Sequence, residues 1–133
     1  MEELLKTINE VEVETGISAF TIRYYDKCGF LPGIARNSQK RRRFSQQNID
    51  RLLLVDALLK SGLSIDGLKS IMPALNADTY SDELYQLIQT KLTTIDVKIE
   101  ELNICKERLL NYAADILFKQ NYANFAESNE LDV

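Results

Sequence analysis

Residues 18–32 read SAFTIRYYDKCGFLP, a short amphipathic helix that ends at a glycine. Ser18 is a typical N-cap residue, and Gly29 is a typical stop signal. Ile22 and Tyr25 are three residues apart and therefore share one helix face, which we expect to be buried. The same spacing directs three other side chains away from that face: Arg23, Tyr24 and Lys27.

A second short helix is predicted immediately before this one. Thr7 precedes the apolar positions Ile8 and Val11, and Thr15-Gly16 forms a C-terminal glycine signal. Two short helices joined by a tight turn that contains glycine are typical of a helix-turn-helix. In that motif the second helix enters the major groove of DNA.

The segment after the second helix, residues 30–44, predicts a short β-hairpin, or wing. Pro32-Gly33 is a turn signal, and proline excludes a helix at that point. Two further helices follow. We expect one from a cap at Ser45 to the stop at Ser61-Gly62, and one from a cap at Ser64 to an end at Pro73.

The remainder of the chain predicts one long helix with an apolar seam. A helix from about Ser81 to Phe118 would be roughly 55 Å long. Its a and d positions repeat in heptads as in a coiled coil: Tyr85, Ile88, Leu92, Ile95, Ile99, Leu102, Lys106, Leu109, Ala113 and Ile116.

Such a rod exposes too much apolar surface for a small N-terminal domain to cover, so we expect a second copy of the chain to pair with it. A long helix folded back on its own subunit is the alternative. Lys106, at an a position, either sets the register of the pairing or lies near its end.

Basic side chains concentrate in the first half of a chain whose net charge is −4. Residues 20–51 contain eight Lys and Arg against two Asp. A local excess of this kind is typical of a phosphate-binding surface. A solvated charged face is the alternative, because charge runs are common on protein surfaces.

Composition narrows the class of protein further. The 133 residues are 45% apolar and 27% charged, which predicts one globular domain with an extension. There is no histidine, which removes the commonest general base and metal ligand and makes an enzyme the weaker class. No apolar run is long enough to span a membrane, and the acidic N-terminal segment is unlike a signal peptide. The two cysteines, Cys28 and Cys105, are far apart in the sequence and do not indicate a disulfide-stabilised fold. We expect a reduced, cytoplasmic protein without membrane contact or cofactor.

Taken together, residues 7–72 closely resemble the MerR family of transcription regulators. The block from Arg23 to Pro32 is the most specific part of the match, and the long helix is similar to the family's dimerisation helix. The matching segments follow in the family's order: Thr7-Ile8-Asn9-Glu10-Val11, Thr15-Gly16-Ile17-Ser18, Thr21-Ile22-Arg23-Tyr24-Tyr25-Asp26, Gly29-Phe30-Leu31-Pro32, Arg42-Arg43-Phe44-Ser45 and Leu58-Leu59-Lys60-Ser61-Gly62-Leu63-Ser64.

The resemblance implies a mainly α fold in three parts. Residues 1–76 would form a winged helix-turn-helix DNA-binding domain, 77–119 a dimerisation helix in an antiparallel coiled coil, and 120–133 a short tail. The homodimer would bind an inverted repeat in promoter DNA and, in response to an effector, distort the spacer so that RNA polymerase can start. The dimerisation residues would be Ile88, Leu92, Ile95, Ile99, Leu102, Leu109 and Ile116.

The resemblance also implies residue roles. Arg23 would contact phosphate or a base edge, and Tyr24 would bind a phosphate or pack in the core. Ser18 and Thr21 either bond phosphates or act locally as caps. The remaining candidates for phosphate contact are basic: Lys27, Lys40, Arg41, Arg42 and Arg43.

Several positions depart from the family pattern. Glu12 falls where a small buried residue is usual, so we expect the first helix to shift or to expose this side chain. Phe20 replaces a residue that is often basic, and Phe44 lacks the hydroxyl of the usual wing tyrosine. Lys40 and Arg41 stand where glycine and an aromatic are common, which puts the turn of the wing in question.

The C-terminal part has neither the cysteines nor a histidine for the family's thiolate metal site, so no metal is expected. We expect Cys105 to be a small buried hydrophobe; the alternative is that Cys105 or Cys28 is a reactive thiol that senses redox state or electrophiles. Leu117, Phe118, Tyr122 and Phe125 would form a helix that caps the partner's DNA-binding domain, or line a small pocket, and 128–133 would be disordered. Two rival functions stay open: an architectural DNA-binding protein, and a coiled-coil interaction protein.

Overall fold

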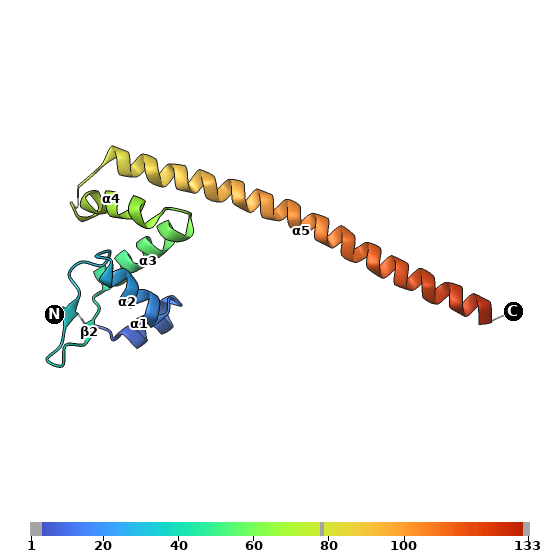
Figure 1. The fold of residues 1–133 in the computed structure, drawn as a ribbon, viewed down its shortest axis with the longest axis horizontal. Helices are drawn as coiled ribbons and strands as arrows, with labels where there is room; N and C mark the ends of the chain where they lie inside the picture. The colour runs from blue at the N-terminus through green and yellow to red at the C-terminus, as the bar shows by residue number, and fades with distance from the viewer. Residues whose placement is uncertain (1–3, 78, 132–133) are drawn as a thin grey trace. The chain divides into compact units, whose positions relative to one another are not determined.

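The computed structural model describes residues 4–77 and 79–131, with side chains through Ser128. The chain forms two compact units, residues 1–91 and residues 92–133. Five helices and a two-stranded sheet make up the described structure, in the order α1, α2, β1, β2, α3, α4 and α5 (Figure 1). The fold is thus mainly helical, as predicted.

The helix-turn-helix is formed by α1 (Ile8–Thr15) and α2 (Ala19–Lys27). Thr7 caps α1 in a capping box with Glu10, in which each side chain accepts a hydrogen bond from the other residue's backbone N–H, at 3.2 and 2.9 Å. Gly16 ends α1 with φ 75°, a left-handed conformation that favours glycine. Ser18 caps α2, so both predicted helices begin and end where the sequence placed them.

The wing is an antiparallel pair of two-residue strands, β1 (Ala35–Arg36) and β2 (Arg42–Arg43). An isolated bridge between Lys6 and Phe44 continues it toward the N-terminus. Lys40 takes a φ of 63° in the turn, the left-handed region that glycine adopts at little cost. Lys40 does so because Asn37 organises the turn: its Oδ1 accepts from Gln39 N and Arg41 N, and its carbonyl accepts from Lys40 N.

The core lies between α1, α2, the wing, α3 (Gln46–Lys60) and α4 (Ile65–Asn76). Each large apolar side chain buried there stabilises the fold by about 1.5–3 kcal/mol. Every one of these elements, and the loop before the wing, contributes at least one of the largest fully buried side chains: Val11, Ile22, Phe30, Phe44, Ile49, Leu52, Val55 and Leu68.

The expected end of the fourth helix at Pro73 is wrong, because α4 continues through this proline to Asn76. Proline removes one backbone hydrogen bond, but three contacts hold the last turn in place. Leu75 packs against the core, and the Arg51 guanidinium donates to the Leu75 carbonyl at 3.0 Å and to Asn76 Oδ1 at 2.6 Å. Arg51 therefore caps a helix end and is not part of the basic surface.

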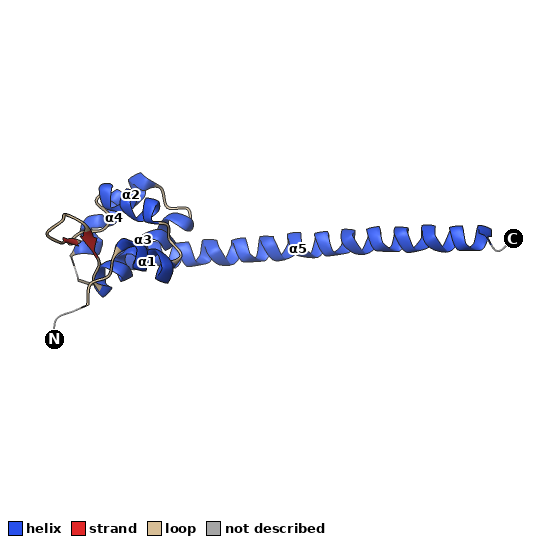
Figure 2. Ribbon diagram, turned by 90° about the horizontal axis from the view of Figure 1, so that it is seen from below, coloured by secondary structure: helices blue, strands red, loops and turns tan. Residues whose placement is uncertain are grey.

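The last helix, α5 (Asp82–Leu131), has 50 residues and is about 75 Å long at about 1.5 Å per residue. It runs without a break (Figure 2). The expected helix end at Phe118 is therefore wrong, and so is the expected disorder of residues 128–131; residues 132–133 lie outside the described part. The sequence from 119 onward contains neither proline nor glycine, so nothing local ends the helix.

Candidate nucleic-acid interface

The start of α2 is held by two oxygen acceptors. Ser18 Oγ accepts from Thr21 N at 3.1 Å and donates to Thr21 Oγ1 at 2.9 Å. Glu12 reaches across the turn, and its Oε1 accepts from Ala19 N at 3.0 Å. A carboxylate at a helix N-terminus is favoured by the helix dipole, so Glu12 is a second cap for α2. Glu12 is half-buried, so the expectation that this side chain is exposed is not met.

One face of α2 is buried and the other is open. Ile22 and Tyr25 are in the core, whereas Arg23 and Lys27 are exposed and Phe20 is 77% exposed. Tyr24 is 46% exposed, so the interpretation of this ring as a core residue is wrong. A hydrogen bond between Tyr24 and the Cys28 side chain raises the pKa of the Tyr24 hydroxyl.

Asp26 joins α2 to the wing. Its Oδ2 lies 2.7 Å from Arg42 Nε and 3.9 Å from an Arg36 guanidinium nitrogen. The Asp26 and Arg42 side chains are each only 21% exposed, so solvent screens this pair less than a surface ion pair. Nothing in the sequence predicts this contact, because residues sixteen positions apart and on different elements give no pattern in one sequence.

A groove of about 620 Å³ lies between the open face of α2 and the wing. Most of the side chains around it are basic or aromatic, and Asp26 is its single carboxylate. The lining residues are Phe20, Arg23, Tyr24, Asp26, Lys27, Arg36 and Arg42. The structure thus brings together four of the predicted site residues, Arg23, Tyr24, Lys27 and Arg42. It adds three residues that are not among the predicted ones: Phe20, Asp26 and Arg36.

The other predicted basic residues lie on the wing. Lys40 and Arg41 are exposed, and Arg43 is half-buried, with its guanidinium donating to the Arg42 carbonyl at 2.9 Å. A second, smaller depression of about 260 Å³ separates these residues from the start of α1. It is lined by Thr7, Ile8, Asn9, Arg36, Lys40, Arg41, Arg42 and Arg43.

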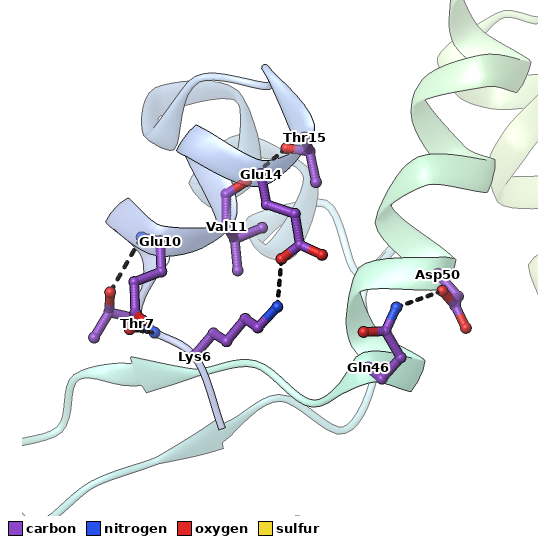
Figure 3. A network of polar contacts seen from close by, with 8 residues as sticks. All are labelled: Lys6, Thr7, Glu10, Val11, Glu14, Thr15, Gln46 and Asp50. Carbon is purple, nitrogen blue, oxygen red and sulfur yellow. Dashed lines mark hydrogen bonds and ion pairs between the residues drawn. The ribbon is translucent and has the colours of Figure 1, made fainter. Parts of the chain in front are cut away.

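Backbone and side-chain contacts fix α1 to the wing. Lys6 and Phe44 exchange two backbone hydrogen bonds, at 2.8 and 2.9 Å. The Lys6 ammonium then reaches Glu14 on α1 at 2.7 Å, as Figure 3 shows beside the Thr7–Glu10 capping box. Phe44 itself is fully buried, so the position that lacks the expected hydroxyl is a core position in this chain.

A buried polar chain links α2 to α3. The Tyr25 hydroxyl donates to Asp56 Oδ1 at 3.0 Å, and Asp56 Oδ2 pairs with Lys60 at 2.7 Å. Burial, together with the hydrogen bond to Asp56, raises the pKa of Tyr25 to about 12. Asp56 is 8% exposed and fully partnered, so this network sets the orientation of α2 on the core.

The predicted seam of α5 is apolar and open to solvent in the single chain. From Leu92 to Ile116 its large apolar members are 39–70% exposed. Ile88 differs, because it is half-buried and packs against the core of the first unit. Cys105 is exposed, so the expectation that it is buried is not met within one chain.

Neither metal chemistry nor a membrane span is indicated by the described part of the chain. It contains no group of three or more Cys, Asp or Glu side chains that could hold a metal ion. No helix among these residues is both long and apolar enough to cross a membrane.

Comparisons with known proteins agree on one family. Residues 6–75 match the family described as MerR HTH family regulatory protein. The chain is 29% identical over 112 residues to YyaN of Bacillus subtilis, an HTH-type transcriptional regulator, covering 80% of this chain and 81% of that one. It is 27% identical over 105 residues to the mercuric resistance operon regulatory protein of Bacillus cereus, covering 78% and 80%.

A solved structure shares both the fold and part of the sequence. It is HiNmlR, described as a MerR family regulator lacking the sensor domain, bound to promoter DNA. The TM-score is 0.69 with 28% identity, over 74% of this chain and 76% of that one. The helix-turn-helix, the wing and the matched residues 6–75 together show that this chain belongs to the MerR family of helix-turn-helix transcription regulators.

Proposed function

We propose that the chain binds promoter DNA as a homodimer and controls transcription from that promoter. The observation that carries the proposal is the groove between α2 and the wing, with its exposed basic and aromatic side chains. The promoter DNA in the HiNmlR structure supports the same partner for this chain. The uneven charge supports it too, since phosphate contacts need a basic surface whatever the net charge of the molecule.

The proposed contacts fall into two groups. Arg23 and Lys27 on the open face of α2 reach the major groove, with Arg23 on phosphate or a base edge, and the Tyr24 hydroxyl donates to a phosphate. Lys40, Arg41 and Arg43 on the wing bind flanking phosphates. Arg42 contributes mainly by holding the wing on α2 through Asp26, and Ser18 and Thr21 contribute by ordering the first turn of α2.

Dimerisation is supported by the open apolar seam of α5. A helix with this much exposed apolar surface needs a partner, and a second copy offers the same seam. Two copies would place two α2 helices on two half-sites of an inverted repeat. Distortion of the spacer between the half-sites, in response to an effector, would then present the promoter to RNA polymerase.

The first test is selection of binding sites from random duplex DNA with the purified protein at moderate salt. We expect enrichment of an inverted repeat with a fixed centre that the protein does not contact. Tight binding without an enriched motif would instead support the architectural function. Absence of binding at low salt would contradict a DNA partner altogether.

The second test asks whether the open face of α2 contacts DNA. Arg23→Ala with Lys27→Ala should weaken binding to all sequences and make the dependence of affinity on salt shallower by about 0.9 log units per lost phosphate contact. Lys69→Ala, an exposed lysine on α4, is the matched control and should leave the slope unchanged. An unchanged slope in the double variant would exclude the open face of α2 from the interface.

A further inference from the structure

The seam of α5 contains one charged side chain. Lys106 occupies an a position between Leu102 and Leu109, which are 59% and 70% exposed. Its neighbours three and four residues away are Leu102, Asn103, Leu109 and Leu110, and none carries a carboxylate. Among the described residues, the ion pairs of the structure do not involve Lys106.

A carboxylate on the same helix is in the complementary situation. Asp96 occupies an e position at the edge of the seam, and its neighbours three and four residues away are Leu92, Thr93, Ile99 and Glu100. No basic group is within reach along the helix, since Lys98 pairs with Glu101 at 4.0 Å. The described chain therefore presents one cation in the seam and one anion beside it, with no ion pair for either.

Antiparallel pairing of two α5 helices brings these two charges together. In an antiparallel coiled coil each a position faces a d position of the partner. One alignment matches every seam residue from Tyr85 to Ile116, with Ile99 facing the partner's Leu102 at the centre. The same alignment places Lys106 opposite the partner's Ile95, so the next residue, the partner's Asp96, flanks the ammonium. Twofold symmetry forms the contact twice.

The other alignments juxtapose like charges. Parallel pairing would stack Lys106 on the partner's Lys106 inside the seam, although it would also bring Lys91 near the partner's Asp96. An antiparallel shift by one heptad in one direction sets Asp96 against the partner's Asp96 and Lys98 against the partner's Lys98. A shift in the other direction sets Lys91 against the partner's Lys119. Like charges at facing positions are destabilising.

We propose that Lys106 and the partner's Asp96 form two symmetric ion pairs that fix the antiparallel alignment of the α5 helices. The inference rests on the homodimer of the proposed function and names the residues that determine its register. A lysine at an a position weakens a coiled coil relative to an apolar residue, and its effect is to select one alignment over others. Lys106 is thus a specificity residue of the interface rather than a source of stability.

Disulfide trapping tests the alignment. Cys105 is exposed, and in this alignment it faces the partner's Lys98 on the flank of the seam. Lys98→Cys in a Cys28→Ala background should give disulfide-linked dimers on mild oxidation. The Cys28→Ala protein alone, and Lys91→Cys in the same background, should stay unlinked. A link through Cys105 alone or through Lys91→Cys would show a different register and overturn the proposal.

Charge exchange tests the ion pair itself. Lys106→Glu and Asp96→Lys should each weaken dimerisation by about tenfold, because two contacts per dimer are converted to repulsions. The double variant restores opposite charges and should return to within about threefold of the original protein. Arg108→Glu, the same charge change at an outward c position, is the control and should have little effect.

The Lys106→Met variant distinguishes a change of alignment from a loss of folding, because a loss of folding would not make dimerisation tighter. This variant should dimerise more tightly, yet the Lys98→Cys link should become less efficient because other alignments gain population. If the effects of Lys106→Glu and Asp96→Lys on dimerisation affinity are additive in a stable dimer, the ion pair is contradicted, whereas the homodimer is not. A monomer at all concentrations in sedimentation equilibrium would instead contradict the homodimer of the proposed function.

Discussion

Asp26 shows how one side chain can define the spacing between two parts of a binding surface. It lies on α2, faces the groove, and holds Arg42 and Arg36 of the wing at 2.7 and 3.9 Å. A carboxylate reduces the positive potential of the groove and therefore does not help to attract phosphate. The role of Asp26 is instead to hold the two wing arginines in place. The contact keeps the wing at a fixed separation from α2.

We expect Asp26 and Arg42 to be energetically coupled. In a double-mutant cycle with Asp26→Asn and Arg42→Gln, the coupling free energy of unfolding should be about 1–2 kcal/mol, because both side chains are mostly buried. The pair Lys6–Glu14 has a similar distance but side chains 38% and 39% exposed, and its coupling should stay below about 0.5 kcal/mol. Equal coupling in the two pairs would contradict a special role for Asp26.

Lys40 combines backbone strain with a useful charge. Replacement by glycine should raise the free energy of unfolding by about 0.5–1 kcal/mol, since the left-handed conformation costs an ordinary residue about 1–2 kcal/mol and glycine recovers most of that. The same change should weaken DNA binding, because one cation is lost from the wing. Lys40→Gln is the control for charge alone, since glutamine is an ordinary residue that keeps the strain of this conformation while removing the charge. A glycine variant less stable than the original would contradict the assignment of strain.

Tyr25 gives the fold a defined sensitivity to alkali. Its pKa is about 12 in the folded chain, above the value near 10 of an exposed tyrosine. A raised pKa means that the protonated hydroxyl stabilises the folded chain. This contribution to the free energy of unfolding is fully present below about pH 10 and is lost as the pH rises from about 10 to 12. Tyr25→Phe should lower stability by about 1 kcal/mol at neutral pH and make the alkaline loss shallower, measured by urea unfolding across that range. Parallel pH profiles for both proteins would exclude Tyr25 as the source.

At the scale of elements, the turn between α1 and α2 depends on Glu12. The carboxylate satisfies Ala19 N in the first turn of α2, next to the Ser18 cap. Glu12→Ala should lower the free energy of unfolding by about 1 kcal/mol, the usual cost of a lost N-terminal cap. Glu12→Gln keeps an acceptor and should restore most of that stability, which chemical denaturation can measure. Identical losses in both variants would show that the hydrogen bond is unimportant.

The two helices with unexpected ends show what periodicity can and cannot predict. Pro73 was a reasonable stop signal, but Arg51 holds the carbonyl of Leu75 and the side chain of Asn76 from another helix. The heptad seam ends at Ile116, close to the predicted helix end at Phe118, whereas α5 continues to Leu131 because a helix can extend beyond its seam. Apolar periodicity locates a buried face, and only a breaker or a cap locates a helix end.

At the scale of the whole molecule, the boundary between the two units separates folding from assembly. The first unit extends to Lys91 because Ile88 packs against its core, and the remaining part of α5 has its apolar seam exposed. We expect a fragment that ends after Lys91 to fold with the core intact and to be monomeric. Its affinity for the full inverted repeat should fall by about 100-fold or more, because the second half-site is no longer tethered. Sedimentation and fluorescence anisotropy would check both points.

The result that would contradict this division is a fragment that binds the full operator as tightly as the whole chain. A fragment that fails to fold, judged by circular dichroism, would instead show that the first unit depends on the rest of α5. The full-length protein with Arg23→Ala and Lys27→Ala is the complementary control. It should remain a dimer of normal stability while losing affinity for DNA.

The sequence by itself determined the order and type of the elements. Caps at Thr7, Ser18, Ser45 and Ser64, and the glycine stops, act within a few residues along the chain, so one sequence is enough to locate them. The same holds for the two faces of α2 and the seam of α5, which follow from helical spacing. These are local effects of backbone sterics and hydrogen bonding.

Only the tertiary structure decided which polar groups meet across elements. It placed Arg42 on Asp26, Arg51 on the end of α4, Glu12 on the start of α2 and Tyr25 on Asp56. Each of these contacts joins residues that are at least seven positions apart and lie on different elements. Side-chain electrostatics depends on distance in space, and that distance is set by how the apolar core packs. The sequence therefore indicated a basic surface, and the packing decided which of its cations are held by the protein and which are open to DNA.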